Sequence, residues 1–166
     1  MATDQNQYLG NPLLKKANVP VEFTKEQIQE YQKCMDDPVY FIQEYMKIVS
    51  LDEGLVPFKM YDFQRNMVKT FHDNRFTICK LPRQSGKSTT IIAYLLHYVL
   101  FNPNVNVAIL ANKSSTARDI LGRLQLGYEN LPKWLQQGVI SWNKGSLDLE
   151  NGSSILAAST SASAIR

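Results

Sequence analysis

Residues 76–88 read FTICKLPRQSGKS, a short apolar run followed by a polar loop that ends in Gly86-Lys87-Ser88. A short apolar run bounded by turn residues is typical of a buried strand, here residues 76–81. The mostly apolar stretch that follows, residues 86–101, is long enough for a helix packed on a sheet. Strand, loop and helix in this order predict a phosphate-binding loop at a strand-to-helix turn.

The loop supplies the groups that a nucleoside triphosphate requires. Such a ligand needs backbone N–H groups at a helix N-terminus, a lysine on its terminal phosphates and a hydroxyl on Mg²⁺. Gly86, Lys87 and Ser88 provide these three parts, with Ser88 as the metal ligand. We expect ATP and Mg²⁺ as cofactors, bound by the loop residues Arg83, Gln84, Ser85, Gly86, Lys87, Ser88 and Thr89.

The loop also departs from the standard G-x-x-x-x-G-K-[ST] pattern. Leu81 stands where the first glycine belongs, and Arg83 lies three residues before Gly86. A guanidinium at that position could reach the γ-phosphate from within the same chain, as an arginine finger supplied in cis does. Arg83 is therefore a candidate catalytic residue beside Lys87. The alternative is a solvated or ion-paired loop arginine.

Periodicity outside the loop predicts further helices and strands. Thr24 and Gln27 form a capping-box pattern that starts a helix, and Asp37-Pro38 starts a second one ending near residue 49. Apolar spacing and turn signals place the remaining elements as helices at 61–71 and 117–131, a strand at 105–110, and an antiparallel excursion formed by 139–142, 146–149 and 154–158.

The order strand, helix, strand, helix predicts an α/β fold. We expect a P-loop NTPase-type parallel sheet with flanking helices, preceded by an N-terminal helix pair and followed by a small antiparallel hairpin. The predicted domains are a polar arm at 1–20 and a partial P-loop ATPase domain at 21–166, with a helical lead-in at 24–72 and a nucleotide-binding core at 75–166.

Composition is that of an ordinary globular domain. Of 166 residues, 44% are hydrophobic and 20% charged, and the net charge of +3 is only a weak indication of a polyanionic partner. Cys34 and Cys79 lie outside any CxxC or Cys/His pattern, which argues against structural zinc. We expect no signal peptide and no membrane segment.

Several motifs together resemble the large terminase subunit of tailed bacteriophages, in its myovirus branch. The R-Q-x-G-K-[ST] loop is similar to that family's deviant Walker A. Supporting stretches are CMDDPVYF at 34–41, YDFQR at 61–65, ILANK at 109–113, WNKGS at 142–146 and NGSSI at 151–155.

The resemblance implies an ATPase that drives double-stranded DNA into a procapsid in the host-cell cytoplasm. It implies ATPase roles for Arg83, Lys87 and Ser88, and contact of Gln64 with adenine, whose donor and acceptor edges an amide can pair. The alternative for Gln64 is a surface glutamine on a helix. The implied partners are DNA, the portal and the small terminase subunit.

One part of the family pattern is missing. The family continues with an apolar strand that ends in adjacent carboxylates, whereas Asp148/Glu150 and Asp52/Glu53 lie in hairpin and turn contexts. We therefore expect the N-terminal part of a large terminase, with a core incomplete at its C-terminus. It should bind nucleotide weakly or not at all, hydrolyse almost none, and could self-associate through an unpaired sheet edge.

Three other functions fit parts of the pattern. A helicase-like translocase would share the glutamine segment and the loop. A small-molecule kinase would usually keep the first glycine and has no need of Arg83. A nucleotide-binding module without catalysis would lack the carboxylates.

Overall fold

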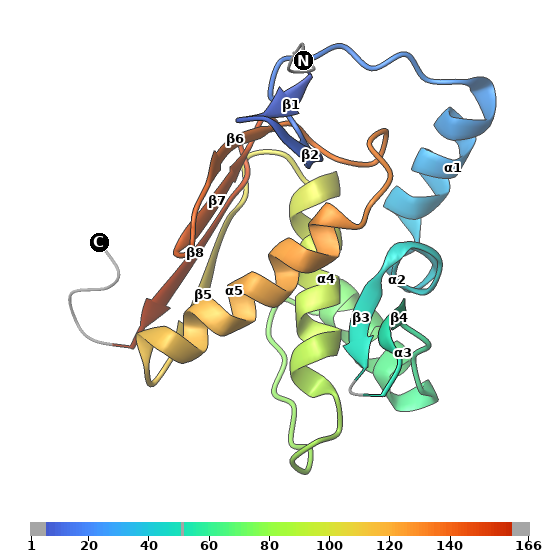
Figure 1. Ribbon diagram of the computed structural model, residues 1–166. Coiled ribbons are helices and arrows are strands. Elements are labelled where there is room, and N and C mark those ends of the chain that lie inside the picture. Colours follow the sequence, from blue (N-terminus) through green and yellow to red (C-terminus); the bar gives the residue numbers. More distant parts are fainter. Residues whose placement is uncertain (1–5, 51, 161–166) are drawn as a thin grey trace.

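Five helices and three β-sheets make up the part of the chain that the computed structural model describes, residues 6–50 and 52–160 (Figure 1). The helices are α1 (Lys25–Asp36), α2 (Pro38–Tyr45), α3 (Asp62–Asp73), α4 (Lys87–Phe101) and α5 (Ser114–Glu129). The strands are β1 (Gln7–Tyr8), β2 (Asn11–Lys15), β3 (Lys47–Ser50), β4 (Gly54–Pro57), β5 (Asn106–Ala111), β6 (Val139–Trp142), β7 (Ser146–Leu149) and β8 (Ser154–Ser159).

The largest sheet is mixed and has the strand order β5-β8-β7-β6. β6, β7 and β8 form the expected antiparallel excursion, and β8 then runs parallel to β5, with Val107 opposite Ile155 and Ile109 opposite Ala157. Helix α5 packs on β5 and β8, and α4 packs on α5 (Figure 1). The α/β class is thus confirmed, but the sheet is mixed rather than parallel.

The strand expected at residues 76–81 is absent, so that prediction is wrong. The segment is an irregular trace between α3 and α4 (Figure 1), with Phe76 82% and Ile78 98% exposed. Thr77, Cys79 and Leu81 are half-buried, so its side chains alternate as in a strand. A β-strand also needs a neighbour for its backbone N–H and C=O groups, and no described segment pairs with this one.

Local capping signals set the starts of the first two helices. Thr24 Oγ1 accepts the Gln27 N–H at 3.2 Å and Gln27 Oε1 accepts the Thr24 N–H at 3.0 Å, which confirms the capping box. The Asp37 carboxylate caps α2. This helix ends at Tyr45 rather than near residue 49, because residues 47–50 pair with β4 as an antiparallel hairpin.

The N-terminal segment is more than a polar arm. β1 and β2 form a hairpin, and Leu14 within it is fully buried in the core. Lys16 forms a parallel bridge with Val139 at the edge of the main sheet, and the Lys15 N–H donates to Gln136 Oε1 at 3.0 Å. The expectation of an arm without a core element is wrong for the described residues, and the domain boundary at residue 20 stays a prediction.

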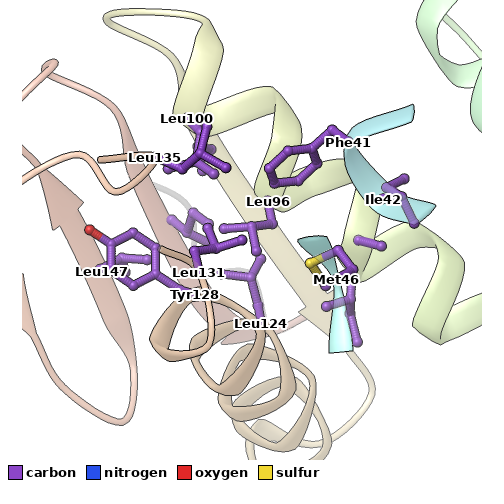
Figure 2. Packing of buried hydrophobic residues seen from close by; sticks show 14 of the residues in the cluster. Phe41, Ile42, Met46, Leu96, Leu100, Leu124, Tyr128, Leu131, Leu135 and Leu147 are labelled. Carbon is purple, nitrogen blue, oxygen red and sulfur yellow. The ribbon is translucent and has the colours of Figure 1, made fainter. Parts of the chain in front are cut away.

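Helix α4 lies at the centre of the hydrophobic core (Figure 2). It packs mainly on α2, α3 and α5 rather than on the sheet as expected, with Ile92 and Val99 buried and Ile91 and Leu95 only half-buried. Gly127 of α5 lies against Met46, which follows α2: an added Cβ would lie 2.8 Å from Met46 Cε, and 3.4 Å from Leu96 Cδ2 of α4.

His97 is the one titratable side chain on α4 that the core encloses. It lies 2% exposed among Phe41, Tyr94 and Phe101, with Nε2 2.9 Å from the Cys34 carbonyl oxygen. Its Nδ1 is buried and has no hydrogen-bond partner among the described residues. Burial lowers the pKa of His97 to about 4, although the bond to the Cys34 carbonyl opposes this shift.

Acidification should therefore weaken the fold between pH 6.5 and 5. The unfolded chain binds a proton on this histidine near pH 6.5, while the folded chain stays neutral, so the free energy of unfolding falls by up to about 1.4 kcal/mol per pH unit. Urea denaturation at pH 7.0 and 5.5 would measure this fall in the free energy of unfolding. His97→Leu should remove this slope and the exposed-site control His72→Asn should keep it; an unchanged slope in His97→Leu would contradict the assignment.

Candidate functional site

The loop before α4 has an unusual backbone. Gln84 and Gly86 both adopt left-handed conformations, with φ of 62° and 74°. Gly86 is the N-cap of α4, and its carbonyl accepts both the Thr90 N–H at 3.0 Å and Thr90 Oγ1 at 3.1 Å. Left-handed residues in such a turn direct successive N–H groups toward one concavity, which is an arrangement that binds anions. A left-handed non-glycine residue such as Gln84 is strained and is typical of a functional loop.

Two side chains of the loop, Lys87 and Ser85, could form further hydrogen bonds. Lys87 Nζ donates to the Pro82 carbonyl at 3.1 Å, so the ammonium folds back over its own loop. Ser85 Oγ is buried and has no hydrogen-bond partner in the described part of the chain. Ser88 is exposed on the first turn of α4. The loop thus presents N–H groups, an ammonium and two hydroxyls within a few residues, which fits a phosphate and its counter-ion.

A cleft of about 560 Å³ opens beside the loop. Part of its lining, which we call the apolar end, consists of Ile48, Phe58, Tyr61 and Phe63, and residues of the loop form much of the rest. Its lining residues are Ile48, Phe58, Lys59, Tyr61, Phe63, Gln64, Leu81, Pro82, Gln84, Ser85, Gly86 and Thr89. At the apolar end the rings of Tyr61 and Phe63 are nearly parallel, with centroids 5.9 Å apart and an interplanar angle of 10°. Their outward faces are flat apolar surfaces for a planar ligand.

The structure brings together most of the residues that the sequence singled out. Gln64, Gln84, Ser85, Gly86 and Thr89 line the same cleft. The apolar end was missed, although YDF at 61–63 carries a recognisable signal in two aromatic residues next to the glutamine. Ile48 and Phe58 left no local signal, because the β3–β4 hairpin brings them to the cleft from outside both motifs.

Three of the predicted site residues, Arg83, Lys87 and Ser88, are not among the residues that line this cleft. Arg83 is exposed and makes no hydrogen bond or ion pair with any residue that the structure describes. Its reach toward a γ-phosphate stays a prediction.

The Glu150 carboxylate has partners away from the cleft. Glu150 accepts hydrogen bonds from Lys15 Nζ at 2.8 Å and from the N–H groups of Gly138 at 2.6 Å and Asn18 at 2.8 Å. Partial burial raises the pKa of Glu150, but these bonds outweigh burial and hold the pKa below its ordinary value. Glu150 therefore fastens the N-terminal hairpin, and no carboxylate is among the described residues that line the cleft.

A comparison with protein families complements this geometry. The family described as terminase large subunit, T4likevirus-type, N-terminal, matches residues 78–166. This range covers the loop, α4 and α5, and all four strands of the main sheet. The chain belongs to this terminase large subunit family. The match begins after α3, so the part of the cleft built by Tyr61, Phe63 and Gln64 rests on the structure alone.

Family membership supports a DNA-packaging terminase role for the chain. Within the part of the terminase chain that the structure describes, none of the helices combines the length and apolarity needed to cross a bilayer.

Gly86→Ala should lower the free energy of unfolding by more than the strain of a left-handed alanine would lower it alone. A Cβ at Gly86 would lie 2.5 Å from Gln64 Nε2, and φ is already left-handed, so we expect a loss of roughly 2–4 kcal/mol. The matched control is Gly54→Ala, where φ is 72° and nothing lies within 4 Å of the new Cβ. Denaturant melts should show a smaller loss for Gly54→Ala. Equal losses would mean that the Gln64 contact is unimportant.

Proposed function

We propose that this chain is the ATP-binding part of a packaging motor that moves double-stranded DNA into a procapsid. The observation that carries the proposal is the left-handed loop Gln84-Ser85-Gly86 at the N-terminus of α4, set at the polar end of a cleft whose other end is apolar. A triphosphate attached to a planar base has the same division between charged and apolar ends. Family membership supports the packaging role.

The phosphate end would be bound by the loop and by the first turn of α4. The backbone N–H groups and the positive end of the α4 dipole favour a polyanion there. Lys87 would exchange its bond to the Pro82 carbonyl for a phosphate oxygen, a stronger charge-assisted contact. Ser88 would hold Mg²⁺, which neutralises phosphate charge when bound.

The base would lie at the apolar end of the cleft. Tyr61 and Phe63 offer ring faces, while Ile48 and Phe58 supply aliphatic and aromatic walls. Adenine is the expected base by resemblance. This end carries the specificity of the site, and the loop carries most of its affinity.

Hydrolysis needs a carboxylate to hold the metal and orient water, and the described cleft lining contains none. We therefore propose that residues 1–166 bind ATP but hydrolyse almost none. The portal and the small terminase subunit remain the proposed partners, and the host-cell cytoplasm the proposed place of action.

Lys87→Ala should reduce ATP affinity at least tenfold and leave the fold intact. The substitution removes the proposed charge-assisted contact with phosphate, and in the ligand-free protein the Lys87 ammonium is bonded to the exposed Pro82 carbonyl. Calorimetric titration of MgATP, with a thermal melt of each variant, would measure both effects. Lys80→Ala, which removes an exposed lysine from the neighbouring extended segment, is the matched control. Equal ATP binding by wild type and Lys87→Ala would show that the site is elsewhere.

Arg83→Ala should spare ATP affinity but abolish turnover. Arg83 is exposed in the loop, and an arginine finger contributes mainly as charge develops in the transition state, where it is worth about 10³-fold or more. Arg83→Lys should not restore turnover, because a point charge does not replace the planar fork. Single-turnover hydrolysis in a large subunit carrying this loop, with a parallel binding titration, tests both. Weaker binding with normal cleavage of bound ATP would make Arg83 a binding residue.

A further inference from the structure

Strand β3 has one edge that no described strand pairs with. β3 and β4 form a two-stranded antiparallel sheet of their own, in which Lys47 lies opposite Pro57. The Phe58 N–H donates to the Met46 carbonyl oxygen at 2.8 Å. Because the backbone groups of an antiparallel strand alternate between its two edges, every second residue from Met46 onward faces β4. The N–H and C=O groups of Lys47 and Val49 therefore point away from β4.

The partners of this strand agree with that alternation. Pro57 has no N–H, so it could not donate to Lys47 even if the Lys47 carbonyl faced it. Among the described residues, no segment other than β4 supplies a hydrogen bond to the backbone of Lys47 or Val49. A row of unpaired N–H and C=O groups is a template on which an extended peptide can add as a further strand.

A cavity of about 390 Å³ runs along this edge. Residues 46–49 line one side of it, and since successive residues of a strand point to opposite faces, a cavity that all four line lies beside the strand. Ile92 of α4 and Leu126 of α5 form apolar parts of the other side. Figure 1 shows β3 between β4 and α4, so the unpaired edge faces the helices. The cavity thus offers an apolar surface next to free backbone groups.

The charges at this cavity are all positive. Lys47 on β3 and Arg123 on α5 are both exposed, and no acidic residue is among the described lining residues. Neither cation makes an ion pair with a described residue, not even Arg123 with Asp119 one turn before it. A ligand with carboxylates complements this pair, whereas a second copy of the chain pairing through β3 would bring like charges together.

We propose that the free edge of β3 binds an extended, acidic segment of a partner protein by strand addition. The backbone groups of Lys47 and Val49 pair with the segment, while its carboxylates meet the Lys47 ammonium and the Arg123 guanidinium. An apolar side chain of the segment packs on Ile92 and Leu126. Thr89 of α4 lines both this cavity and the cleft beside the loop, so the segment lies against a wall of that cleft. The inference does not depend on nucleotide binding.

A charge-reversal experiment tests the choice of an acidic ligand. The probe is a fluorescently labelled octapeptide of alternating glutamate and valine, whose like charges oppose pairing with itself at pH 7. We expect Lys47→Glu/Arg123→Glu to weaken its binding to the chain at least tenfold. Lys69→Glu/Arg118→Glu makes the same change in net charge at exposed positions outside the cavity and should bind as wild type does. Equal losses in the two variants, or no binding by wild type, would overturn the proposal.

N-methylation of the probe separates strand addition from attraction between charges. Methylating every second amide removes the donors from one edge of an extended peptide and leaves those of the other edge. Two such peptides, methylated in opposite registers, carry the same charge. We expect one to bind like the parent peptide and the other at least tenfold more weakly. Equal affinities of the two would mean that the backbone of the peptide does not pair with β3, and the proposal would fail.

Amide exchange identifies the edge that the peptide occupies. Saturating peptide should slow hydrogen–deuterium exchange of the Lys47 and Val49 amides several-fold and leave Ile48, which already faces β4, unchanged. Unchanged exchange at Lys47 and Val49 would place the peptide elsewhere. Sedimentation of the chain alone tests the other occupant: a dimer that the peptide dissociates would assign this edge to a second copy and contradict the proposal.

Discussion

Helix α4 can be stable only if most of its circumference is covered, and this requirement organises the described chain. Its buried residues are Thr90, Ile92, Ala93, Leu96, His97, Val99 and Leu100. A helix with so little polar surface needs cover on several sides, which α2, α3 and α5 provide. Its first turn emerges at the cleft because α3 crosses there, so the loop residues and the Tyr61–Phe63 face come together as a consequence of packing.

A second constraint is the satisfaction of buried polar groups where the N-terminal hairpin meets the sheet. Gln136 Nε2 donates to the carbonyls of Leu13, Tyr128 and Leu131, and Gln136 Oε1 accepts from Lys15. Neighbouring Glu150 binds the Lys15 ammonium. Each buried amide or carboxylate left without such partners would cost about 1–3 kcal/mol or more. The hairpin is therefore held by specific polar contacts in addition to the burial of Leu14.

The site combines rigid and adaptable parts. Gly86 and Thr90 are tied into the first turn of α4, whereas Arg83 is free of described partners and Lys87 is held by one exposed carbonyl. An arrangement of this kind binds phosphate with preorganised backbone groups, while its charged side chains move to meet the ligand. Segment 76–81 leads into the loop without a strand partner, so the stability of the loop depends on α3 and α4 rather than on the sheet.

Features that depend on neighbouring residues could be predicted from the sequence. The Thr24 capping box, the Asp37 cap and the antiparallel excursion of β6, β7 and β8 are all local, and each lies where the residues predicted it. Pairings between distant segments, such as β5 with β8 and the Gln64 amide with Ser85, could be read only from the folded structure. Those contacts depend on which segments meet in space, and an apolar run such as 76–81 becomes a strand only where a partner meets its backbone.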